Sequence, residues 1–315
     1  MGKLMTASQF PRLMDDRLTK VFEGKLKAYQ SNMIPMLYNV STSDKAFDEF
    51  YDIEGLPDIP EMSGSLSYIS SSPGYYTKIE QKEYGAITQF ERKLLDFKRY
   101  KVMDNRVGDL GEALARTMEK KAVRPIANAF SAAFDYQTSE EGVSLCSTAH
   151  TTKVPGVSTT SGFSNSGTTA ISKAAIAAAR LAGKGFRMGN GERANVRLDT
   201  VIVPSALYDT ACEATGYDPR NGATSDLDPD NLNNKVNVVR GIKVIEWTYL
   251  DDYSTKNWYM VDFAMMKRFL VWINSQKAEI ENRFDYHTKA AESSVYARWA
   301  NGTTAWQFIQ GNQVT

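Results

Sequence analysis

A chain of 315 residues, 42% of them hydrophobic and 23% charged, is long enough to bury one large core or two smaller ones. Its 37 basic residues balance 37 acidic ones, which disfavours extensive contact with nucleic-acid phosphates but leaves room for a local basic patch. Two cysteines far apart in the sequence, Cys146 and Cys212, exclude a disulfide framework and a zinc site. They favour a reduced, cytoplasmic origin. The start of the chain lacks the apolar core of a signal peptide, and the longest apolar run is too short to cross a membrane.

Residues 1–50 form a polar segment whose scattered apolar positions indicate one or two short amphipathic helices. The first 35 residues carry six basic and three acidic side chains, so this arm is mildly positive. Such an arm cannot form a core by itself. We therefore expect a neighbouring subunit to order it.

Residues 52–74 are rich in the turn formers Gly, Pro and Ser, and two strand-like runs follow at 75–80 and 84–92. The pattern predicts a long, hairpin-like loop that projects from the body of the molecule. Loops of this length are usually functional. Its strands are too polar to be buried on both faces, which is typical of a surface that meets a partner.

The longest helical signal covers residues 104–135, where apolar side chains recur every three or four positions. About 30 residues at 1.5 Å per residue predict a rod roughly 45 Å long. Asp104 is one candidate N-cap, and Asp109 with Glu112 has the form of a capping box. Pro125 falls inside the rod, and because the apolar spacing continues past it we predict a kink and not a stop.

A linker rich in Ser, Thr and Gly at 151–167 predicts a crossing between domains. An α/β pattern follows, with helices at 169–182 and 206–215 around a strand at 198–203. From residue 236 the signal is rich in strands, at 236–239, 242–249, 258–263, 269–273, 278–284 and 293–299. All five tryptophans lie at or after Trp247, so we expect the principal core there, packed against the long helix.

Four motifs in the sequence are candidate sites. Cys146 and His150 are the only Cys/His pair close in sequence, but no recognised nucleophile pattern surrounds them. Asp226, Asp228 and Asp230 have calcium-loop spacing yet lack the turn glycine and the closing glutamate, which favours a solvated acidic loop. Residues 183–191 contain paired glycines, but no strand precedes them as in a phosphate loop, and residues 162–166 miss the second glycine of a nucleophile elbow. The sequence therefore predicts no catalytic residue, no cofactor and no metal.

The order of these features resembles the major capsid proteins of tailed phages, which share the Hong Kong 97-type fold. Four local phrases are similar to the Mu-like major head branch. They are Ile87-Thr-Gln-Phe-Glu-Arg-Lys-Leu-Leu-Asp96, Leu145-Cys-Ser-Thr-Ala-His150, Asp199-Thr-Val-Ile-Val-Pro-Ser-Ala-Leu207 and Thr304-Ala-Trp306.

The resemblance implies an α+β chain with four parts: an N-terminal arm (1–50), an extended loop (51–100), a peripheral domain with the spine helix (101–155 and 264–315) and an axial domain (156–263). It implies a non-enzymatic subunit that self-assembles through hexamers and pentamers into an icosahedral head around double-stranded DNA. The expected interface residues are Arg12, Arg17, Lys20, Tyr75, Tyr76, Lys78 and Glu80.

The implied partners are copies of the chain, a portal and packaged DNA contacted without sequence preference, with a decoration protein left open and no membrane. The residues before the spine helix leave no room for a cleaved scaffolding segment, so a separate scaffold protein is implied. The expected location is the virion, after assembly in the host cytoplasm. Two alternatives stay open: an encapsulin-like compartment with protein cargo, and a soluble enzyme with Cys146 as its nucleophile.

Overall fold

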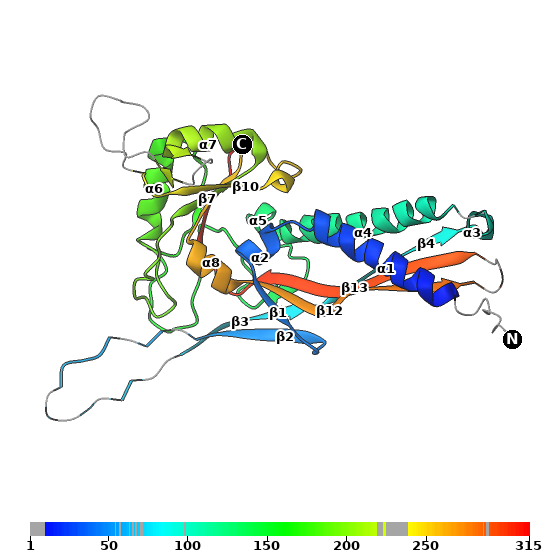
Figure 1. Cartoon of the computed structure of the whole chain (residues 1–315). Helices are drawn as coiled ribbons and strands as arrows, with labels where there is room; N and C mark the ends of the chain where they lie inside the picture. The colour runs from blue at the N-terminus through cyan, green and yellow to red at the C-terminus, as the bar shows by residue number, and fades with distance from the viewer. Residues whose placement is uncertain are drawn as a thin grey trace.

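The computed structural model of the chain is a mixed α and β molecule with a long hairpin projecting from its lower edge (Figure 1). It describes residues 10–53, 55–56, 58–62, 64, 66, 68–69, 72–97, 99–218, 223–224, 239–285, 287 and 290–315. The helices α1 and α4 extend along one side of the molecule, and α6, α7 and β10 lie together at its upper end (Figure 1).

A four-stranded sheet forms the centre of the elongated half, in the order β1-β12-β13-β4. Its strands are β1 (Asn39–Thr42), β12 (Leu270–Phe284), β13 (Ala291–Thr303) and β4 (Lys82–Phe90). The antiparallel pair β12 and β13 is the longest ladder, with Leu270 opposite Thr303 and Phe284 opposite Ala291. It joins the runs predicted at 269–273 and 278–284 into one strand, so the break expected between them was wrong.

A five-stranded sheet in the order β10-β7-β11-β14-β6 lies at the upper end. Its strands are β10 (Lys243–Glu246), β7 (Thr200–Val203), β11 (Trp258–Val261), β14 (Ile309–Asn312) and β6 (Ser166–Gly167). Every residue of β7, β11 and β14 is buried, as expected for strands covered on both faces. The strands predicted near 198–203, 242–249 and 258–263 are confirmed, and β14 was not predicted.

Short helices flank this sheet: α6 (Lys173–Gly183), α7 (Tyr208–Thr215) and α8 (Phe263–Phe269). Ser172 caps α6 by accepting a hydrogen bond from the Ala175 backbone at 3.1 Å. Gly216 ends α7 with a left-handed φ of 66°. Both helices confirm the predicted segments, each a few residues shorter. Other short elements are α2 (Met33–Leu37), α3 (Arg92–Asp96), the 3-10 turns Ser205–Leu207 and Thr248–Leu250, β8 (Tyr217–Asp218) and β9 (Ala223–Thr224).

The projecting hairpin is built differently from the prediction. Strand β2 (Phe47–Ile53) pairs with β3 (Pro73–Glu80), which also pairs with β5 (Gln137–Ser139). Strand β4 instead joins β13 in the other sheet. The runs at 75–80 and 84–92 are therefore strands, as predicted, but they are not partners. The projection is the β2–β3 hairpin and its connecting segment (Figure 1).

The long helix starts earlier and stops sooner than the predicted range of 104–135. Helix α4 covers Tyr100–Ala122, about 34 Å at 1.5 Å per residue, and α5 covers only Arg124–Ala127. Asp104 and Asp109 lie inside α4, so neither is its N-cap. Apolar spacing past Pro125 belongs to α5 and to non-helical chain, and the prediction of a continuous kinked rod was wrong.

Pro125 explains the stop. It has no N–H to offer the carbonyl of Lys121, and that carbonyl accepts a 2.7 Å hydrogen bond from Asn301 Nδ2 on β13 instead. The next carbonyl, of Ala122, accepts a hydrogen bond from the buried Tyr38 hydroxyl. Burial raises the pKa of Tyr38, which keeps its hydroxyl protonated as a donor. Two side chains distant in sequence thus cap the end of α4.

Helix α1 (Phe10–Tyr29) packs along α4 within the same chain (Figure 1). Leu18 and Phe22 are buried there. Gly111 permits the close approach, because a Cβ at this position would lie 2.9 Å from the Phe22 carbonyl oxygen. The expectation that a neighbouring subunit must order the arm was therefore wrong for its described residues.

Four of the five tryptophans are among the largest fully buried side chains: Trp247, Trp258, Trp272 and Trp299. This confirms the core expected in the last third of the chain. Trp247 Nε1 donates a 2.7 Å hydrogen bond to Glu119 of α4, which ties the spine helix to this core. None of the described helices is both long and apolar enough to span a bilayer.

Candidate functional site

The most exposed apolar side chains of the described residues gather between β2 and β3. Ile59 is 87% exposed, Leu66 is 83% exposed and Tyr68 is fully exposed. Leu56 and Met62 in the same segment are more than half exposed. Scattered exposed apolar residues are ordinary on protein surfaces, but a concentration on one projecting segment marks an interaction site. We call residues 55–69 the apolar tip.

The base of the hairpin carries the four interface residues predicted on β3. Tyr75 is half-buried, and its hydroxyl lies 2.9 Å from Thr151 Oγ1. Tyr76 is 36% exposed beside the ring of Tyr51. The remaining pair, Lys78 and Glu80, form an ion pair at 2.6 Å. Since this pair is exposed, it contributes little to stability.

That ion pair shifts both pKa values in the expected directions. The hydrogen bond to Glu80 raises the pKa of Lys78, and the hydrogen bond to Lys78 lowers the pKa of Glu80. Lys78 Nζ also lies 4.2 Å from the centre of the Phe47 ring on β2. Lys78 therefore contacts both strands of the hairpin within its own chain.

The basic arm residues lie on α1. Arg17 forms a salt bridge with Asp104 of α4 and lies over the ring of Tyr100 at 5.5 Å. Lys20 is exposed on the same helix. The side chain of Arg12 lies outside the described residues. Arg17 therefore interacts within its own chain. The interface role of all seven predicted residues stays a prediction.

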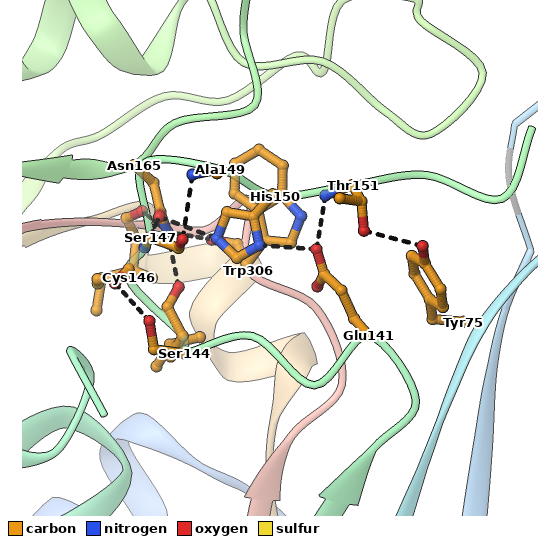
Figure 2. A network of polar contacts seen from close by, with 12 residues as sticks. Tyr75, Glu141, Ser144, Cys146, Ser147, Ala149, His150, Thr151, Asn165 and Trp306 are labelled. Atoms are coloured by element: carbon orange, nitrogen blue, oxygen red, sulfur yellow. Dashed lines mark hydrogen bonds and ion pairs between the residues drawn. The ribbon is translucent and has the colours of Figure 1, made fainter. Parts of the chain in front are cut away.

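A buried polar network joins the linker to the C-terminal strands (Figure 2). Asn165, fully buried, is its centre. The Asn165 amide oxygen accepts the Ser147 backbone N–H at 2.8 Å. Its amide nitrogen donates to the carbonyls of Leu145 at 2.9 Å and Ile309 at 3.1 Å. One side chain therefore satisfies buried backbone groups from two segments far apart in sequence.

His150 extends this network toward the hairpin (Figure 2). Its ring stacks on Trp306 with the centroids 4.2 Å apart and the planes 3° apart. Nε2 lies 3.1 Å from the Asn165 amide oxygen, and Nδ1 lies 3.1 Å from a Glu141 carboxylate oxygen. The same carboxylate oxygen accepts the Thr151 backbone N–H at 2.8 Å. Thr151 in turn contacts Tyr75 of β3, so the network reaches the hairpin.

This geometry opposes the Cys146 nucleophile hypothesis. Cys146 is buried, and burial raises the pKa of its thiol far above the ordinary value. A Cβ on Gly311 would come within 2.6 Å of the Cys146 sulfur, so the thiol is tightly enclosed. Both nitrogens of His150 face other oxygens. Cys146 is therefore a packed core residue, and His150 is a member of the polar network.

Among the other motifs, the structure describes the paired glycines but not the three spaced aspartates. Residues 226, 228 and 230 lie outside the described residues. The glycines at 183–191 end α6 and shape a turn, with Arg187 donating to the Gly191 carbonyl at 2.5 Å. Within the described part of the chain, no group of three or more His, Cys, Asp or Glu side chains could hold a metal ion.

Sequence reasoning missed the apolar tip and the partners of His150. The tip had a visible signal, since a segment rich in Gly, Pro and Ser still contains a large apolar residue every few positions. Glu141 and Asn165 gave no such signal. They meet His150 only because the linker folds back on itself, with His150 N–H bonded to the Phe163 carbonyl at 2.9 Å.

Three comparisons bear on the fold and the family. The model of a family described as phage capsid protein matches residues 75–309. The capsid structure of cyanophage P-SCSP1u is similar at a TM-score of 0.55 and 13% identity, over 91% of this chain and 89% of that chain. A structure of Microbacterium phage Oxtober96 has a TM-score of 0.55 and 8% identity, over 91% of each chain. No curated protein sequence matches.

A further solved structure, the mature capsid of bacteriophage PhiM1, is similar at a TM-score of 0.54 and 11% identity, over 88% of this chain and 86% of that chain. At identities this low, the structural similarity shows a shared fold alone. The chain therefore has the Hong Kong 97-type α+β fold expected from its sequence, while the Mu-like branch stays a prediction.

Proposed function

Given that this chain belongs to the phage capsid protein family, we propose that it is the major capsid subunit, which assembles through hexamers and pentamers into an icosahedral head around double-stranded DNA. The family match favours this function over the encapsulin-like compartment and over the Cys146 enzyme.

The observation that carries the proposal is the apolar tip. Ile59, Leu66 and Tyr68 expose most of their surface on the projecting hairpin (Figure 1). Burying each such side chain would contribute roughly 1.5–3 kcal/mol. In an assembled shell these side chains would be buried against a neighbouring copy, and each contact would gain this free energy. In the free monomer the same side chains stay exposed to water.

The finer parts of the proposal follow the resemblance. We infer that the hairpin is the extended loop, that α4 is the spine helix of a peripheral domain, and that the five-stranded sheet belongs to the axial domain. The inferred partners are a separate scaffold, a portal and packaged DNA. We place the assembled protein in the virion and its assembly in the host cytoplasm.

Purified protein tests the proposal directly. We expect size-exclusion chromatography to resolve capsomers, and negative-stain microscopy to show closed shells, with or without a co-expressed scaffold. A protein that stays monomeric under every assembly condition would contradict it. Thiol titration is a separate check on the enzyme alternative, since a reactive Cys146 in the folded chain would reopen that reading.

A further inference from the structure

A basic cavity of about 690 Å³ opens beside the carboxyl end of α6. Its charged lining consists of one acid, Asp199, and five bases: Arg180, Lys184, Arg193, Arg197 and Arg240. Arg240 has another partner in the chain, and the other four bases minus the one acid leave an excess of three positive charges in a chain whose net charge is zero. A concave surface lined by one sign of charge concentrates ions of the opposite sign. The cavity is thus the local basic patch that the overall charge left room for.

The fold aims two of these arginines outward together. Ala194, Val196 and Leu198 are buried, whereas Arg193 and Arg197 are exposed. This alternation is that of an extended chain, where side chains two or four positions apart lie on the same face. Hydrogen bonds fix the segment at both ends. Ala194 N–H donates to the Phe186 carbonyl at 2.8 Å, and Arg197 N–H donates to Asp262 Oδ2 at 2.8 Å.

The end of α6 is locked against this extended segment. A Cβ on Gly183 would lie only 2.5 Å from Leu198 Cδ1, so only glycine allows the helix to come this close. Arg180 in the last helical turn and Lys184 just after it therefore lie beside Arg193 and Arg197. The cations belong to separate segments but to one rigid surface. Preorganised charges of this kind bind a ligand without the entropy cost of gathering them.

Arg193 and Arg197 keep their charges available within the described part of the chain. Asp199 is occupied by other donors, the Thr200 hydroxyl at 3.0 Å and the Phe263 backbone N–H at 3.2 Å. Within the part of the chain that the structure describes, neither Arg193 nor Arg197 forms an ion pair. Cations at the carboxyl end of a helix also favour its dipole, which accounts for Arg180 and Lys184. It does not account for Arg193 and Arg197, which lie outside any helix.

We propose that this cavity binds phosphate groups, and that their source is the backbone of the packaged duplex. The inference rests on the proposed capsid function for that source. Four of the five cations are arginines, whose planar guanidinium matches two phosphate oxygens at once. No base-reading geometry is required, because phosphate contacts position a duplex without reading its sequence. Lys184, between the paired glycines, acts here through its side chain and not through a backbone cradle.

The test measures binding of a short fluorescein-labelled duplex to the full chain by anisotropy over a series of salt concentrations. Each phosphate contact contributes about 0.9 to the slope of log K against log salt. The double variant Arg193→Glu/Arg197→Glu should lower that slope by about 1.8 and weaken binding roughly 60-fold at 0.1 M salt. The milder Arg193→Gln/Arg197→Gln should show the same change of slope, and it guards against misfolding by the charge reversal.

The matched control is Lys45→Glu/Lys256→Glu, which makes the same change in net charge at two exposed lysines outside the cavity. It should leave the slope unchanged. An equal loss in the control would overturn the proposal, because binding would then depend on net charge alone. Displacement of the duplex by a poly-glutamate peptide, but not by inorganic triphosphate, would also overturn it in favour of an acidic protein partner.

Competition by triphosphate settles the source of the phosphates. If triphosphate displaces the duplex only at far higher phosphate concentration, the duplex backbone is the ligand. Equal competition would keep phosphate as the chemistry but overturn the duplex as its source. Shell formation is scored separately by microscopy on the same proteins. Shells without duplex binding would contradict this inference alone, whereas absence of shells in the unmodified protein would contradict the proposed function.

Discussion

The five-stranded sheet and the β2–β3 hairpin follow opposite rules of packing within one chain. Strands β7, β11 and β14 are buried along their whole length, and Asn165 satisfies the backbone groups beside them. The hairpin leaves Ile59 and Leu66 more than four-fifths exposed. The sheet therefore buries its apolar side chains within the monomer, and the hairpin does not.

Under the proposed function, this difference separates residues that fold the subunit from residues that would join subunits. Substitutions in the sheet and its network should change the free energy of unfolding of the monomer. Substitutions in the apolar tip should change assembly and leave the monomer as stable as before. Each experiment below tests one side of that division, from the largest expected loss of stability to the smallest.

Asn165→Ala should cost the most. It removes the side chain that joins the half-buried Ser147 N–H to the buried Leu145 and Ile309 carbonyls, and each of these groups loses a hydrogen-bond partner. We expect the free energy of unfolding to fall by about 3–5 kcal/mol, measured by urea titration of the monomer. Asn105→Ala is the control, because Asn105 is exposed on α4; its effect should stay within about 0.5 kcal/mol.

Gly111→Ala and Gly24→Ala are one substitution in two helices that pack together. At Gly111 the new Cβ would meet the Phe22 carbonyl at 2.9 Å, whereas at Gly24 nothing lies within 4 Å. We expect Gly111→Ala to lose about 1–3 kcal/mol by forcing α1 away from α4. Gly24→Ala should gain about 0.5–1 kcal/mol from helix propensity. Thermal unfolding of both proteins measures the pair, and equal signs would contradict the close helix crossing.

Glu119→Gln tests the link between α4 and the tryptophan core through pH. Burial raises the pKa of Glu119, so the folded state favours the protonated form. In the wild type this favourable contribution is fully present below the unfolded pKa and is lost as the pH rises through the raised folded pKa. Glu119→Gln should therefore be more stable than the wild type by about 1 kcal/mol at pH 8. The difference should vanish near pH 4. Unfolding at both pH values measures it, and a constant difference would show that the carboxyl does not titrate with folding.

Ile59→Asp/Leu66→Asp should leave monomer stability within about 0.5 kcal/mol, because both side chains are already exposed. It should abolish shells in negative-stain images, since a charged group would have to be buried at the contact. Leu181→Asp places the same change on a 71% exposed leucine of α6. Assembly lost in Leu181→Asp but kept in the tip variant would reverse the roles assigned to the two regions.

Much of the fold could be predicted from local pattern. The apolar spacing of α4, the alanine-rich α6 and the short helix α7 are properties of local sequence, and the structure confirms these three helices. The order of these elements also sufficed to suggest the family, because chains with only about 10% sequence identity still share this fold.

Pairing between distant segments could not be predicted in the same way. Strands β3 and β4 are neighbours in sequence but lie in different sheets, and no local pattern distinguishes that arrangement from a hairpin. The end of α4 depended on Asn301, nearly two hundred residues further on. The basic cavity likewise combines separate segments, and no single one of them has an unusual charge.

The single residue Gln81 between β3 and β4 has a mechanical consequence. Glu80 N–H donates to the Tyr136 carbonyl at 2.7 Å, and Gln81 Nε2 donates to Asp48 Oδ2 at 3.3 Å. With so short a joint, the hairpin cannot swing independently of β5 and the sheet beyond it. A force applied at the apolar tip would be transmitted along β3 to its partner strand β5. Strand β5 leads directly into the loop that carries Glu141. Contact with a neighbouring subunit at the tip would therefore change the geometry of the hydrogen bonds that Glu141 makes with His150 and Thr151.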